Sequence, residues 1–264
     1  MASLARFGLA TFVAAATGCT LLTDVGGLSG GPADPGAEAG GDVAVASVDA
    51  RADAPDSTMP ACAPPAFCDD FERGDLTGAW SGLQTVGGTL AIDPAVSSSP
   101  TRSLRADLAA STAQRTVYLE RLVPVGTLGV KISFSFRIEA SPATTNALAG
   151  IQLGTPLSSV FVSVNGSSLG LLAQNYMNGD SHGYPLGATK LGEWDRITIE
   201  LRRTTPSGTP TLRVTRGLPA TLLVDEAVTV ALGAPSAYRI GIIYAAAGDA
   251  GGQAWFDDVR VDLD

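Results

Sequence analysis

The segment that decides the fold is Val130-Lys131-Ile132-Ser133-Phe134-Ser135-Phe136-Arg137-Ile138. Apolar and polar side chains alternate strictly along it, so that the five apolar residues from Val130 to Ile138 share one face. A period of two is the pattern of a β-strand with one face on a core and the other in water. We therefore predict a strand of an antiparallel sheet, because such sheets often keep one face solvated.

Segments with the same alternation follow on both sides, at residues 115–123, 158–164, 194–203, 211–216, 220–228, 238–244 and 254–263. Turn residues separate them, in keeping with the 31 Gly and 16 Pro of the chain. About a dozen short strands and no helix are expected from this spacing. The prediction is an all-β fold, a two-sheet antiparallel jelly-roll sandwich that follows a disordered amino-terminal tether.

The amino-terminal quarter has a different composition. Residues 1–18 carry Arg6 and then an apolar run over 7–16, which is typical of a secretion signal. This run is shorter than the ~20 residues that a membrane-spanning helix needs. Residues 19–60 are rich in Gly, Ala, Pro and Asp and lack the apolar area to offset chain entropy, which predicts a disordered linker. The folded domain is expected over 61–264.

The end of the signal, Ala16-Thr17-Gly18-Cys19, resembles the lipobox of bacterial lipoproteins. The resemblance implies that Cys19 is acylated and becomes the new amino terminus. Thr20 after the cysteine implies export to the outer membrane. We therefore expect a protein of the cell envelope, anchored by lipid at the periplasmic face or the cell surface and touching the membrane only through that anchor. Ordinary signal cleavage is the alternative.

Two of the three cysteines, Cys62 and Cys68, remain once Cys19 is lipidated. An even remainder in an exported protein predicts a disulfide. A metal site is the alternative, but the single histidine of the chain is His182, and two thiols alone are poor zinc ligands.

The charge balance excludes one class of partner. The chain carries 17 Lys and Arg against 26 Asp and Glu, a formal net charge of −9. A nucleic-acid-binding domain needs a basic surface, so we expect no nucleic-acid partner.

Three stretches resemble the concanavalin A-like and laminin G-like jelly-roll domains of bacterial extracellular proteins. They are residues 69–74 with Trp80, residues 192–201, and residues 255–261, and the resemblance covers 67–264. It implies a binding module for carbohydrate or another cell-envelope polymer. It also implies one structural calcium ion, with Asp70, Glu72 and Asp257 as the ligands, because oxygen ligands suit calcium.

Two motifs suggest catalysis, and neither is complete. Glu193 and Asp195 match the start of the laminarinase-type E-x-D-x-E signature, but Ile197 stands where the second catalytic Glu belongs. Residues 179–183 fit the serine-hydrolase pattern G-x-S-x-G, yet no helix is expected after them and His182 adjoins the serine. We expect a protein that is not an enzyme, with a degenerate glycosidase as the weaker alternative.

The predicted ligand site is the segment 174–184, read as a loop. It gathers rings that could stack on a sugar and polar groups that could bind its hydroxyls. The candidate residues are Asn175, Tyr176, Asn178, Asp180, His182 and Tyr184. The alternative is an ordinary polar turn on a structural or adhesive surface lipoprotein with no small ligand. Exposure of both Tyr176 and Tyr184 would favour binding. The tryptophans Trp80, Trp194 and Trp255 are expected in the core.

Overall fold

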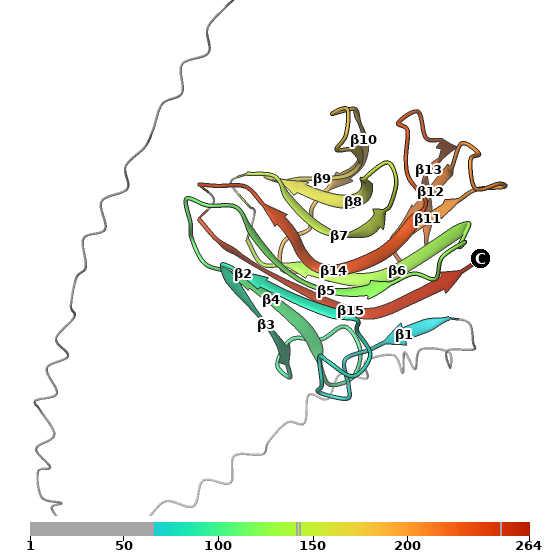
Figure 1. The fold of residues 1–264 in the computed structure, drawn as a ribbon. Helices are drawn as coiled ribbons and strands as arrows, with labels where there is room; N and C mark the ends of the chain where they lie inside the picture. The colour runs from blue at the N-terminus through green and yellow to red at the C-terminus, as the bar shows by residue number, and fades with distance from the viewer. Residues whose placement is uncertain (1–65, 141, 143, 249) are drawn as a thin grey trace, which may run out of the picture. The chain divides into compact units, whose positions relative to one another are not determined.

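The computed structural model describes residues 66–140, 142, 144–248 and 250–264. This part of the chain folds into fifteen β-strands and no helix, arranged as two facing antiparallel sheets (Figure 1). The predicted all-β sandwich is therefore confirmed. No helix in this part of the chain is long and apolar enough to cross a membrane.

Sheet A has eight strands. In spatial order they are β13 (Thr221–Ala227), β12 (Thr211–Arg216), β11 (Asp195–Arg202), β6 (Gly129–Ile138), β15 (Gly252–Leu263), β4 (Ser103–Leu108) and β3 (Gly88–Asp93), with β1 (Phe67–Asp69) paired to β15. Sheet B has seven. They are β10 (Ser181–Ala188), β9 (Ser168–Asn175), β8 (Ser158–Asn165), β7 (Asn146–Leu153), β14 (Pro235–Ala245), β5 (Arg115–Leu122) and β2 (Gly82–Val86).

The core lies between the sheets and is built by the predicted alternation. All five apolar residues of β6 are buried, and Phe134 packs its ring 6.1 Å from Phe136 and 6.4 Å from Phe256 between ring centres. The polar residues of β6, from Lys131 to Arg137, occupy the opposite, outward face of sheet A. This segregation fixes the register, since a slip of one residue would exchange the two faces.

The first and last strands lie side by side, as the jelly-roll resemblance implies. Phe67 of β1 is opposite Val261 of β15, and the ring of Phe67 contacts Trp80 edge-on at 5.1 Å. The Trp80 indole N–H donates a 2.7 Å hydrogen bond to the buried Asp69. These contacts hold β1 in place beside β15.

Several strands were not predicted, because burial on both faces or Gly and Pro residues remove the alternation from their sequences. In β7 the residues from Asn146 to Ile151 are buried on both faces, so no alternation is left in the sequence. In β10 the residues Gly183, Pro185 and Gly187 conceal the strand, which is tolerated because β10 is the edge of sheet B and Pro needs no ladder partner there.

Several predictions fall outside the described residues. They concern the signal over 1–18, the lipid on Cys19, the linker over 19–60 and Cys62. Cys68 lies in β1, whereas Cys62 lies outside the described residues. Their predicted disulfide therefore stays a prediction.

Candidate ligand-binding face

The predicted loop 174–184 is a β-hairpin. Asn175 ends β9, residues 176–180 form the turn, and Ser181 begins β10. The prediction of one continuous loop is therefore wrong. Because side chains alternate along a strand, the six candidate residues are divided between the two faces of sheet B and the tip of the turn.

Three of the six face the interior of the sandwich or its rim. His182 is opposite Ala173 and Tyr184 is opposite Leu171, and both partners are core residues. Tyr184 is only 5% exposed, whereas His182, two residues earlier, is exposed and contacts its ring. The buried Asn175 donates a 2.7 Å hydrogen bond from Nδ2 to the Ala231 carbonyl. Asn175 and Tyr184 thus support the hairpin.

The other three do not form a common site either. Asn178 and Asp180 hydrogen-bond to each other at the tip, with Nδ2 2.6 Å from Oδ2. Tyr176 is 48% exposed and folds onto the outward face of sheet B, where its hydroxyl lies 2.7 Å from the Ser159 Oγ. One tyrosine is exposed and the other buried, so the paired platform expected from the sequence does not form.

Tyr176 instead joins a row of polar side chains across the outward face of sheet B. We call this row the polar stripe, and its members are Tyr118, Glu120, Gln152, Ser159, Tyr176 and Arg239. Strands β5, β14, β7 and β8 and the turn after β9 supply them. Side chains from five neighbouring segments therefore meet on one surface, opposite the core.

Arg239 is the centre of the stripe. Its Nε and Nη2 atoms each lie 2.7 Å from Glu120 Oε2, and its Nη1 donates a 3.1 Å hydrogen bond to Gln152 Oε1. The guanidinium also lies 4.6 Å from the ring centre of Tyr118, within cation–π range. Each of the four side chains is held by another, so the stripe is ordered before any ligand arrives.

The electrostatics of the stripe are balanced. The positive charge of Arg239 is paired with the negative charge of Glu120, and both side chains are about one quarter exposed. Burial raises the pKa of the Tyr118 phenol; the charge of Arg239 opposes this rise and that of Glu120 adds to it. The stripe therefore offers a neutral phenol, an amide, hydroxyls and a paired guanidinium. A ligand rich in hydroxyls matches this set.

The sequence predicts part of this face but not how its strands are paired. The alternation that predicts β5 also places Tyr118 and Glu120 outward, away from Val117 and Leu119. Their meeting with Arg239 depends on a pairing that spans 119 residues, which the sequence alone does not reveal.

The carboxylates predicted for calcium have protein partners. Glu72 accepts hydrogen bonds from the backbone N–H groups of Thr101 and Arg102, at 3.1 and 2.9 Å. The fully buried Asp257 accepts from the N–H groups of Ser98 and Ser99, at 2.9 and 2.8 Å. These two side chains attach the 98–102 segment to the terminal strands.

A calcium site does not fit this arrangement. Asp70 accepts a 3.2 Å hydrogen bond from the Glu72 N–H in a local turn. Among the residues that the structure describes, no three His, Cys, Asp or Glu side chains are grouped so that they could hold a metal ion. The expected ligands Asp70, Glu72 and Asp257 are therefore not brought together.

The two enzyme-like motifs also have structural explanations. Ile197 is fully buried in the core, and Asp195 pairs with Arg216 at 2.6 Å. The G-x-S-x-G segment leads from the hairpin turn into β10 rather than into a helix. These positions offer no pair of facing carboxylates and no nucleophile elbow.

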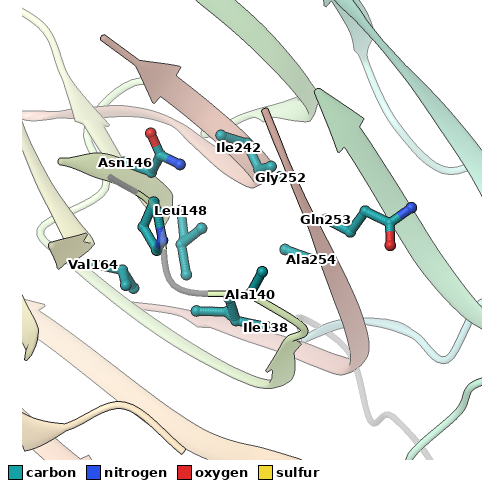
Figure 2. A pocket seen from close by; sticks show the side chains of 10 residues that line it. Ile138, Ala140, Asn146, Leu148, Val164, Ile242, Gly252, Gln253 and Ala254 are labelled. Carbon is teal, nitrogen blue, oxygen red and sulfur yellow. The ribbon is translucent and has the colours of Figure 1, made fainter. Parts of the chain in front are cut away.

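A small pocket lies between the sheets at one end of the sandwich (Figure 2). Ile138 and Ala254 of sheet A line it together with Leu148 and Ile242 of sheet B. Its space of about 10 Å³ could hold roughly one water molecule. A sugar ring does not fit in this pocket.

Comparisons with known proteins support the fold. No protein-family model matches the chain, and no curated protein matches it. Among solved structures, the "Cellulose induced protein, Cip1" is similar, with 16% identity, a TM-score of 0.56, and coverage of 74% of this chain and 96% of that one. A carbohydrate esterase, vb_24B_21 of the Shiga toxin-encoding bacteriophage phi24B, has 12% identity and a TM-score of 0.47, with coverage of 75% and 97%. At this level the likeness to Cip1 shows a shared β-sandwich fold alone.

Proposed function

We propose that the chain is a non-catalytic glycan-binding module of the bacterial cell envelope, and that the polar stripe is its binding face. The observation that carries the proposal is the row of Tyr118, Arg239, Gln152 and Tyr176, which combines aromatic rings with planar polar groups. Sugar-binding surfaces use this combination, because rings pack on the apolar face of a pyranose while amides and guanidinium groups bind its hydroxyls.

The stripe favours binding over hydrolysis. Glycoside hydrolysis in most enzyme families requires two carboxyl groups on either side of the scissile bond. The stripe holds one, Glu120, and Arg239 contacts it through two nitrogen atoms. A single carboxylate leaves this two-carboxylate arrangement incomplete.

The amino-terminal segment supplies the location in this proposal. A lipid on Cys19 would hold the protein at the outer membrane, and residues 19–60 would act as a tether for the binding module. Replacing Cys19 by Ser should move the protein from the detergent phase to the aqueous phase in a Triton X-114 partition of whole cells. Retention of the variant in the detergent phase would contradict the anchor.

A screen of the full-length protein on a glycan array and against insoluble polysaccharides tests the binding function. Cellulose belongs in this panel because a similar structure is a cellulose-induced protein. We expect at least one glycan to bind, and Tyr176→Ala to weaken that binding by about tenfold.

Tyr184→Phe is the matched control, since it removes a buried hydroxyl that has no hydrogen-bond partner in the described part of the chain. It should leave binding unchanged. If a folded wild-type protein binds no glycan, the rival function of a structural or adhesive surface lipoprotein is preferred.

A further inference from the structure

The outward face of sheet A contains a groove, on the side of the sandwich opposite the polar stripe. Its volume is about 200 Å³, and its lining includes Ser98, Ser135 of β6, Lys190, Trp194 and Arg196 of β11. A pyranose ring fits a space of this size. A wider hollow of about 320 Å³ lies on the same sheet face, beside the hydrogen-bonded pair Ser133 and Thr198.

Trp194 gives this groove an aromatic wall. Of the three tryptophans of the chain, Trp80 and Trp255 are buried at 7% and 5% exposure, as expected from the sequence. Trp194 is partly exposed and lines the groove, which corrects its predicted place in the core. The part of the indole that lines the groove can contact the apolar face of a sugar.

Asp258 organises the polar side of the groove. Its Oδ2 atom accepts hydrogen bonds from the hydroxyls of Ser98, at 3.4 Å, and Ser135, at 3.2 Å, and lies 3.7 Å from the Arg196 guanidinium. Both hydroxyl hydrogens therefore point to the carboxylate, so the hydroxyl oxygens are left as acceptors for a ligand. Arg196 and Lys190 add donors.

The backbone at Asp258 is strained, which is a second and independent observation. Its φ is +50°, in the left-handed region that residues other than glycine rarely adopt, and the ladder between β15 and β6 shifts register between Asp257 and Arg260. Asp258 is 6% exposed, and its Oδ1 atom is buried without a hydrogen-bond partner in the described part of the chain. Strain and unsatisfied polar atoms of this kind collect at functional sites.

We infer that this groove is a second glycan subsite, independent of the polar stripe, which takes one pyranose ring of a hydroxyl-rich oligosaccharide. Trp194 stacks on the ring, Ser98 and Ser135 accept hydrogen bonds from its hydroxyls, and Arg196 donates. Asp258 acts as a positioning residue through the two serines. Where this inference is combined with the proposed function, on which this one point rests, the module has a site on each face and binds two glycan strands at once.

Isothermal titration calorimetry of the full-length protein tests this inference, with cellohexaose, xylohexaose, mannohexaose and maltohexaose as the probes. We expect at least one of them to bind the groove. Trp194→Ala should weaken this binding about tenfold, and Trp194→Phe should restore part of it. Ser98→Ala is the second variant, since it removes an exposed hydroxyl and keeps the N–H that Asp257 binds. It should weaken binding by a few fold.

Tyr176→Ala separates the two faces, and equal melting temperatures verify the folding of each variant. Binding that is lost in Trp194→Ala and kept in Tyr176→Ala supports the groove, even if the polar stripe binds nothing. Binding that is lost only in Tyr176→Ala supports the stripe and overturns the groove. Binding that is lost in both variants contradicts an independent groove and overturns the inference. Absence of binding by all four probes to the wild type also overturns it.

Discussion

Arg203 is a buried cation that no acidic side chain in the described part of the chain neutralises. It is 8% exposed, and burial lowers its pKa. Its Nη2 atom donates hydrogen bonds of 2.6 and 2.7 Å to the carbonyls of Leu232 and Gly233, and its Nη1 atom donates to those of Pro206 and Gly208, both at 3.2 Å. One side chain therefore joins two loops at the end of the sandwich.

Removing this guanidinium should destabilise the fold strongly. Arg203→Met leaves four carbonyls without a donor and should lower the free energy of unfolding by about 3 kcal/mol in a urea titration. The control is Arg202→Met, whose side chain is 58% exposed and pairs only at the surface. It should change stability by less than about 1 kcal/mol. Equal effects of the two substitutions would contradict this role for Arg203.

Asp257 should make stability depend on pH. Burial raises its pKa from 3.8 to about 6; hydrogen bonds from Ser99 oppose this rise and the charge of Asp258 adds to it. The folded state therefore holds this proton more tightly than the unfolded state does. The stability contribution is complete below about pH 4 and is lost as the pH rises through 6.

The test compares urea unfolding of the wild type and Asp257→Asn between pH 4 and pH 7. Relative to the variant, the wild type should lose on the order of 3 kcal/mol over this range, since each pKa unit corresponds to about 1.4 kcal/mol. A constant difference between the wild type and Asp257→Asn would show that the pKa of Asp257 is not raised.

At the scale of the element, periodicity predicts strands whose two faces differ and misses those whose faces are alike. Strands β6 and β11 have one buried and one outward face, and their segments 130–138 and 194–203 were predicted closely. Strand β7 is buried on both faces and was missed. The prediction of the candidate site was wrong for a related reason. Because the hairpin was read as a loop, the opposite orientations of Tyr176 and Tyr184 were not expected.

The β9–β10 hairpin provides an element-scale prediction. Asn175 holds its turn twice, by donating to the Ala231 carbonyl and by accepting a 2.9 Å hydrogen bond from the Met177 N–H. Asn175→Ala should lower the free energy of unfolding by about 2 kcal/mol, because it removes a buried side chain that makes both hydrogen bonds. Asn178→Ala, at the exposed tip, should cost under about 0.5 kcal/mol. Similar midpoints for the two variants in urea would contradict the structural role of Asn175.

At the scale of the whole molecule, the first and last strands of the sandwich are joined through protein contacts alone. The first strand pairs with β15, and Asp257 of β15 accepts a hydrogen bond from the 98–102 segment. Glu72, which follows β1, accepts another from the same segment. The melting temperature should therefore be the same, within about 1 °C, in calcium and in EGTA. A ligand that binds only the folded state raises the melting temperature, so a reversible rise of several degrees in calcium would establish the site expected from the jelly-roll resemblance.

We propose above that the outward face of sheet B binds glycan. The most direct measurement is the mapping of amide and side-chain NMR shifts of the full-length protein during titration with the strongest glycan from the array. We expect shifts at Tyr118, Gln152, Tyr176 and Arg239, while the signals of the buried Tyr184 stay in place. A titration that saturates and leaves all four stripe residues unshifted would contradict it.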